Sequence, residues 1–230
     1  MNTVTETKEK EFVHATRVHT ALTAGIEKRV LIWMAQRMPA AIHSDHLTGL
    51  ALAAQILAGV AYALSSRDAR ALWLVNGLLA LNWFGDSLDG TLARVRNQQR
   101  PRYGFYVDHV ADAIGAFALM AGLGFSGYLH WQIAIGMLVC FYALAIESYL
   151  ATYTIGRFHI SHGLFGPTEI RIVLAIGNAF LYVHPYVTVA NQHFLLFDAG
   201  GVVAIAGMAF MFVVASVRHT TLLYRAEPRV

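Results

Sequence analysis

The chain has 230 residues and a formal net charge of +3, with 57% hydrophobic and 13% charged residues. A water-soluble globular domain is about 25% charged, so this composition excludes that class and indicates an integral membrane protein. The single cysteine, Cys140, excludes a disulfide within the chain and a thiolate metal cluster. The small positive charge suits an anionic membrane leaflet, and the composition does not indicate a nucleic-acid partner.

The N-terminal segment, residues 1–42, is predicted to lie in the cytoplasm. Its first dozen residues are polar and mixed in charge, so we expect no cleavable signal peptide. Within residues 15–38, apolar side chains are interleaved with Lys28, Arg29 and Arg37, a pattern typical of a helix that lies in the membrane interface. A plain solvated helix is the alternative interpretation.

Apolar stretches of about the 20-residue spanning length recur along the rest of the chain. They cover residues 47–64, 71–93, 105–128, 131–153, 169–190 and 197–217. The predicted fold class is therefore all-α. We expect a six-helix transmembrane bundle over residues 43–222, preceded by the amphipathic helix and followed by a cytoplasmic tail at 223–230.

Basic residues set the predicted orientation in the membrane. All 17 except Arg67 and Arg70 precede the first span, follow the last one, or lie in or beside the loops after the second and fourth spans. By the positive-inside rule, both termini and the arginine-rich loops face the cytoplasm. We expect the inner membrane of a bacterium as the location.

Four of the seven aspartates lie within the second and third predicted spans. Asp86 and Asp89 are three residues apart, and Asp108 and Asp112 are four apart, so each pair occupies one face of a helix. In an antiparallel hairpin Asp86 and Asp112 both lie about 10 Å inside the cytoplasmic end. An aspartate at the centre of a span costs roughly 2.5–3.5 kcal/mol, so we expect a bound group to offset the cost of these acids.

Four carboxylates carry a formal charge of −4, which two divalent cations would neutralise. All-oxygen ligation favours Mg²⁺ or Mn²⁺ over zinc, and Mg²⁺ keeps coordination positions open for phosphate oxygens. Gly90, Ala93 and Gly104 remove bulk on the same helix faces, either for a phosphate or nucleotide or for close helix packing. Arg94 can neutralise phosphate, or it can serve only to orient the span.

The whole pattern, D-x2-D-G-x2-A-R-x9-G-x3-D-x3-D, resembles the signature of the CDP-alcohol phosphotransferases, membrane enzymes of phospholipid synthesis. The resemblance runs from about residue 42 to 220. It implies a six-helix fold, often homodimeric, in which the four aspartates hold two Mg²⁺ or Mn²⁺ ions. It also implies that Asp112 is a general base and that Gly90, Ala93, Arg94 and Gly104 shape the CDP site.

Shorter similarities to members of this family suggest two further candidate site residues. The Leu47-Thr48 step resembles part of the family's entry to the first helix, which makes Thr48 a candidate cytidine contact or a helix-entry residue. The Asp108-His109 step is similar to one in choline/ethanolamine phosphotransferases, which makes His109 a second candidate base. On a helix His109 is rotated by about 100° from Asp108.

The reaction implied by the resemblance is attack of an alcohol hydroxyl on the phosphorus of a CDP-linked donor, with release of CMP. Two arrangements of donor and acceptor fit the signature. The donor is either CDP-diacylglycerol, with a small polar alcohol as acceptor, or a CDP-linked small alcohol, with diacylglycerol as acceptor. In both, the protein's partners include membrane lipid.

Residues for the acceptor are expected near the cytoplasmic loop at 154–168. Arg157, His159, His162 and Arg171 could receive a phosphorylated or zwitterionic head group, although each could instead orient a span or solvate the loop. Glu147 in the fourth span must pair with another group or face a cavity.

Two other functions share parts of this pattern. A UbiA-type prenyltransferase also uses aspartate-rich pyrophosphate sites, but its two motifs lie far apart and its helices are more numerous. A membrane cation transporter could place acids in a cavity, but it would need them near the midplane and without adjacent arginines.

Overall fold

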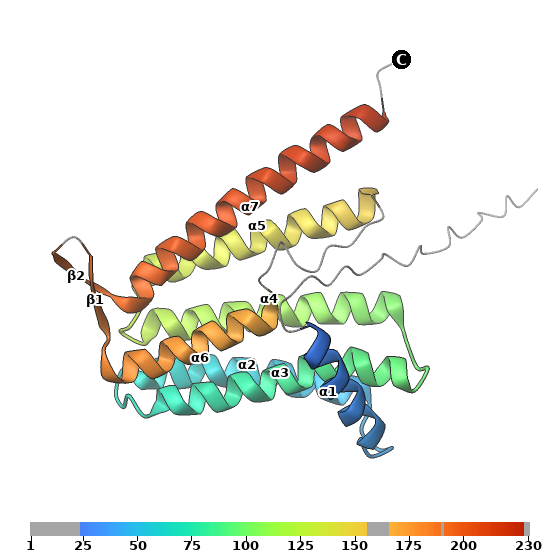
Figure 1. The fold of residues 1–230 in the computed structure, drawn as a ribbon, viewed down its shortest axis with the longest axis horizontal. Helices are drawn as coiled ribbons and strands as arrows, with labels where there is room; N and C mark the ends of the chain where they lie inside the picture. Colours follow the sequence, from blue (N-terminus) through green and yellow to red (C-terminus); the bar gives the residue numbers. More distant parts are fainter. Residues whose placement is uncertain (1–23, 156–165, 190, 228–230) are drawn as a thin grey trace, which may run out of the picture.

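A computed structural model describes residues 24–155, 166–189 and 191–227. The described residues form seven helices and one two-stranded hairpin (Figure 1). The elements are α1 (Ala24–Arg37), α2 (Ser44–Ser65), α3 (Ala71–Val95), α4 (Pro101–Phe125), α5 (Trp131–Ile155), α6 (Pro167–Val183), β1 (Tyr186–Val189), β2 (Gln192–Leu195) and α7 (Leu196–Ala226). Three predicted acceptor residues, Arg157, His159 and His162, lie outside the described residues.

Helix α2 is the centre of the bundle, because it packs against both α3 and α4. Its contact with α4 is a close backbone approach at two glycines. A Cβ atom at Gly59 would collide with the backbone of Ala118, and one at Gly122 would collide with the backbone of Gly59. Small residues therefore let these two apolar helices meet closely, as is common in membrane bundles.

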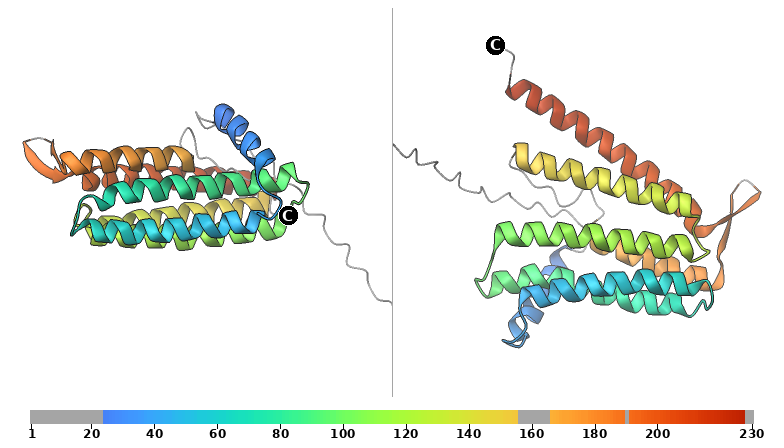
Figure 2. Two further views of the ribbon diagram at one scale, coloured as in Figure 1. Left: turned by 90° about the horizontal axis from the view of Figure 1, so that it is seen from below. Right: turned by 180° about the vertical axis from the view of Figure 1, so that it is seen from behind.

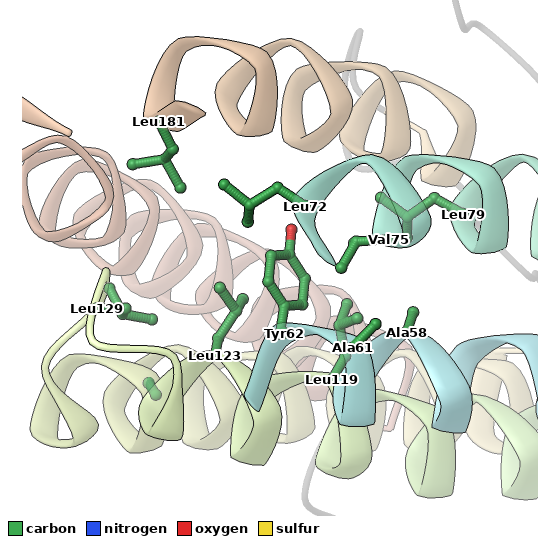
Figure 3. Packing of buried hydrophobic residues seen from close by; sticks show 11 residues of the cluster. Ala58, Ala61, Tyr62, Leu72, Val75, Leu79, Leu119, Leu123, Leu129 and Leu181 are labelled. Carbon is green, nitrogen blue, oxygen red and sulfur yellow. The ribbon is translucent and has the colours of Figure 1, made fainter. Parts of the chain in front are cut away.

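The main core lies where α2, α3, α4 and α6 meet (Figure 3). Tyr62 of α2 is fully buried there, and its hydroxyl donates a hydrogen bond to Oδ1 of Asn178 at 2.9 Å. The Asn178 amide in turn donates to Oδ1 of Asn76 at 2.7 Å. Helix α6 is therefore attached to α2 and α3 by buried hydrogen bonds as well as by apolar packing.

Helices α5 and α7 pack on each other, and α7 diverges from the rest of the bundle (Figure 1). Many of their large apolar side chains are exposed, among them Val139, Leu150, Val203 and Phe210. In water such a surface would be costly, whereas contact with lipid tails removes that cost.

Among the described helices, four are long and apolar enough to cross a membrane: α2, α4, α5 and α7. Helix α3 carries Asn76, Asn82 and two aspartates, which lower its hydropathy. Helix α6 has 17 residues, and a helix of that length spans about 25 Å, less than the roughly 30 Å of a hydrocarbon core. The helical fold class is confirmed, while the count of six spans stays a prediction.

The predicted end of the span at 169–190 is wrong. Helix α6 stops at Val183, and an antiparallel hairpin follows with Tyr186 opposite Leu195 and Val189 opposite Gln192. Pro185 lacks a backbone donor and cannot continue a helix, and the β-branched residues after it favour a strand. Asn191 has a φ of 67°, a left-handed conformation that asparagine tolerates.

Helix α1 lies obliquely across the bundle, as both views in Figure 2 show. Its residues Leu31 and Ala35 are buried against Leu88 and Leu92 of α3, while Trp33 on the other side is exposed. A helix in this segment agrees with the sequence, and its position in the membrane interface stays a prediction.

The described connections between the helices lie at two opposite ends of the molecule (Figure 1). Helix α1, the connection between α3 and α4, and the C-terminal end of α7 lie at one end, and the hairpin lies at the other (Figure 1). The end that contains α1 is the predicted cytoplasmic side. Helix α7 continues to Ala226, past the predicted limit of the last span at 217.

Candidate active site

Three aspartates meet between α3 and α4. Asp86, Asp108 and Asp112 each present one carboxylate oxygen, and these oxygens lie within 4.8 Å of one another. The helical spacing of Asp108 and Asp112 places both on the face of α4 toward Asp86, as the sequence predicts. The three side chains are only partly exposed, and a partly buried carboxylate cluster of this kind could hold a divalent cation.

The acids border a small pocket whose far wall is helix α2. Thr48, Ala51 and Gln55 of α2 line it together with Asp86 and Asp112. Helices α3 and α4 both pack on α2, and among the described residues they make little direct contact with each other. The carboxylates therefore face a space that backbone packing leaves between α3 and α4.

Asp89 is not a member of the closely spaced group of three. Its Oδ2 accepts a hydrogen bond from Oγ1 of Thr48 at 2.6 Å, its Oδ1 accepts one from the backbone N–H of Gly90, and its backbone carbonyl accepts one from Ser44 at 3.0 Å. Its negative charge still acts on Asp112. Thr48, predicted as a cytidine contact, here orients Asp89, and its role toward CDP stays a prediction.

Arg171 supplies a positive charge to the acidic cluster. Its Nη2 donates to Oδ2 of Asp86 at 2.7 Å, and its Nε donates to Oδ1 of Asn82 at 2.7 Å. Asn82 is fixed by a bond from its amide to the carbonyl of Ala51 at 2.9 Å. The Nη1 of Arg171 is buried and has no hydrogen-bond partner in the described part of the chain.

Asn82 is not among the site residues predicted for this family, although a signal for it exists in the sequence. An asparagine four residues before Asp86 lies on the same face of an apolar helix. Arg171 was predicted as an acceptor residue from its place at the start of the fifth span. Its contact with Asp86 depends on how α6 packs against α3, which residue spacing does not reveal.

His109 lies in an aromatic cluster between α4 and α5. Its ring centroid lies 4.1 Å from that of Phe105 and 4.7 Å from that of Tyr149. Its Nδ1 lies 2.6 Å from the carbonyl oxygen of Phe105. A carbonyl can only accept, so in the neutral ring the proton is on Nδ1 and Nε2 is left as an acceptor.

The two signature glycines have open surroundings. Among the described residues, nothing lies within 4 Å of a Cβ atom built on Gly104, and a Cβ on Gly90 meets only the guanidinium of Arg94, at 3.4 Å. Helix packing therefore does not explain either glycine. Nη2 of Arg94 donates to Oγ1 of Thr91 at 3.0 Å, so this side chain lies along the same helix face.

A larger pocket, of about 470 Å³, opens beside the signature where α2 begins and α3 ends. Ala93 lines it together with His43, Ser44, Asp45 and Arg100. An ion pair joins Asp45 to Arg100, and this contact raises the pKa of the Arg100 guanidinium. The volume is in the range of small-molecule sites. Residue spacing identified Ala93, but it did not identify the other residues of this pocket.

Comparison with protein families matches residues 41–219 to CDP-alcohol phosphatidyltransferase. Comparison with individual curated proteins gives no match. The matched range includes both pockets, the four aspartates and Arg171. It covers most of the chain and confirms the resemblance that the signature indicated.

Proposed function

The chain belongs to the CDP-alcohol phosphatidyltransferase family, whose members are transferases of phosphate-containing groups, and we propose that it moves a phospho-alcohol or phosphatidyl group from a CDP-linked donor to an alcohol hydroxyl. The other product is CMP. The observation that supports this best is the convergence of three carboxylate oxygens within 4.8 Å, at a pocket whose walls include the family signature.

The donor set of the acidic cluster fits hard divalent cations. Asp86, Asp108 and Asp112 offer only oxygen, which favours Mg²⁺ or Mn²⁺. Asp89, one helical turn from Asp86, is the fourth proposed ligand, so that the set could hold two ions. Bound cations would polarise the pyrophosphate and stabilise charge on the leaving CMP.

The larger pocket is the proposed site of the cytidine part of the donor. Ala93 connects it to the signature helix, and Gly90 and Gly104 leave room for the diphosphate to approach the backbone. The guanidinium of Arg94 beside Gly90 can offset phosphate charge.

Asp112 is the proposed general base, because it is the member of the cluster deepest in α4, where it can accept the proton of the attacking hydroxyl. His109 is the alternative, since its Nε2 can accept a proton, but the ring would have to leave its contacts with Phe105 and Tyr149. The Nη1 donor of Arg171, which has no hydrogen-bond partner among the described residues, suits an anionic or polar group of the acceptor.

Both donor arrangements remain within the proposal: CDP-diacylglycerol with a small polar alcohol, or a CDP-linked small alcohol with diacylglycerol. We also propose that the site faces the cytoplasm and that the protein is a homodimer in a bacterial inner membrane. The family match favours this transferase over the prenyltransferase and transporter interpretations.

The test is an assay of CMP release by the purified protein in lipid. CDP-diacylglycerol is offered with serine, glycerol 3-phosphate, inositol phosphate and aminoalcohols, and CDP-linked aminoalcohols are offered with diacylglycerol. Mass spectrometry of the lipid product identifies the acceptor. We expect CMP release with one pairing, lost on chelation of divalent cations and restored by Mg²⁺ or Mn²⁺. Release that does not respond to chelation, or none with any pairing, would contradict the proposal.

A further inference from the structure

A carboxylate on α1 joins two helices of the active site from outside the acidic cluster. Oε1 of Glu27 accepts hydrogen bonds from Nε1 of Trp83 at 2.8 Å, from Oγ of Ser87 at 3.3 Å and from Oγ1 of Thr168 at 2.9 Å. Trp83 and Ser87 belong to α3, and Thr168 belongs to the first turn of α6. One oxygen atom thus connects three helices.

The three donors are next to the residues that form the site. Ser87 directly follows Asp86, and Trp83 directly follows Asn82. Thr168 lies three residues before Arg171, so both are in the first turns of α6. The first turns of α6 are therefore held at two places: Thr168 binds Glu27, and Arg171 binds Asp86 and Asn82 of α3.

We infer that Glu27 is a positioning residue: it holds the first turn of α6 against α3 and thereby keeps Arg171 on Asp86. Leu31 and Ala35 pack helix α1 on α3, so the position of Glu27 relative to α3 is fixed. Without this acceptor, Thr168 loses its bond to α1, and only side chains further along attach α6 to α3. The guanidinium of Arg171 would then be less well fixed beside the acceptor.

The first arm of the test is hydrogen exchange measured by mass spectrometry on the full chain in lipid, and it does not depend on the proposed function. Glu27→Ala is compared with Glu27→Gln, because the glutamine Oε1 can accept the same bonds. We expect about threefold to tenfold faster exchange over residues 167–173 in Glu27→Ala, the size of one lost hydrogen bond, and near wild-type exchange in Glu27→Gln. Lys28→Ala, on an exposed neighbour of Glu27, is the control and should leave this exchange unchanged.

The second arm rests on the proposed function and separates positioning from general stability. In Glu27→Ala we expect the KM for the acceptor alcohol to rise about threefold to tenfold while kcat changes by less than about twofold, with Glu27→Gln restoring the KM. Unchanged exchange at the start of α6 in Glu27→Ala would overturn the inference. So would a loss of kcat without a change of KM, or a glutamine variant as impaired as the alanine one. If no donor supports turnover in the wild-type protein, the proposed function fails and the exchange arm still decides the role of Glu27.

Discussion

At the scale of single residues, the site combines several negatively charged carboxylates with one positively charged group, the guanidinium of Arg171. The charges of Asp86, Asp108 and Asp89 all repel that of Asp112, and Arg171 offsets part of this repulsion. Carboxylates this close together are costly in a membrane unless cations join them. The arrangement that we propose to bind a divalent ion therefore also makes the protein sensitive to the loss of the cation or of Arg171.

Asp89 offers the first test of this balance. We predict that Asp89→Asn abolishes CMP release and weakens Mn²⁺ binding by at least about tenfold, because an anionic ligand is lost. The amide oxygen of asparagine can still accept the bond from Thr48, so the fold should persist. Electron paramagnetic resonance of free Mn²⁺ measures the affinity. A folded variant with near-normal turnover would refute the role of Asp89 as a ligand.

Arg171 offers the opposite test. In Arg171→Gln the carboxylate of Asp86 loses a charged hydrogen-bond partner, and we predict about 2 kcal/mol lower stability without metal. Mn²⁺ should restore more stability to this variant than it adds to the wild type, because a cation then replaces the missing guanidinium charge. Thermal unfolding in detergent, with and without Mn²⁺, measures both. Equal stabilisation of the two proteins by Mn²⁺ would contradict the role of Arg171 as a counter-ion.

At the scale of elements, glycines serve two different purposes. Gly122 lies where α4 meets the backbone of α2, whereas no described residue lies within 4 Å of a Cβ atom built on Gly104, at the start of α4. Both are on the same helix, and both would gain helix propensity from an alanine. Their substitution therefore separates packing from ligand access within one element.

We predict that Gly122→Ala destabilises the protein by about 1–3 kcal/mol, since the added methyl group forces α2 and α4 apart. Gly104→Ala should leave the melting temperature equal or slightly higher but raise the KM for the CDP donor. Thermal unfolding and donor titration of the two variants make the comparison. A destabilised Gly104→Ala protein with an unchanged KM would show that packing, not substrate access, requires this glycine.

Residue spacing predicts contacts within a helix or a hairpin, but not contacts between helices that are distant in the sequence. Helix periodicity predicted that Asp108 and Asp112 share a face, and the signature predicted that Asp86 joins them. The contacts of Arg171 with Asp86 and of Glu27 with Thr168 link residues 85 and 141 positions apart. No local spacing encodes such pairs, because they depend on how α1 and α6 pack on α3.

At the scale of the whole molecule, six of the seven described helices form two groups, and α1 packs on α3 of the first group. Helices α2, α3, α4 and α6 share a core with buried polar links, and α5 and α7 form a pair whose apolar surface is largely exposed. The acidic cluster belongs to the first group, at the end of the molecule where α1 lies. Composition predicted the membrane character of this assembly, but the hairpin after α6 and the length of α7 became visible only in the structure.

The central claim is that Asp86, Asp108 and Asp112 act together as one site for divalent cations that serves CDP-alcohol transfer. It is tested most directly by titrating the purified protein with Mn²⁺ under electron paramagnetic resonance, comparing the wild type with Asp112→Asn. We predict saturable binding by the wild type and at least about tenfold weaker binding by the variant. Equal Mn²⁺ affinity in two folded proteins would contradict the claim.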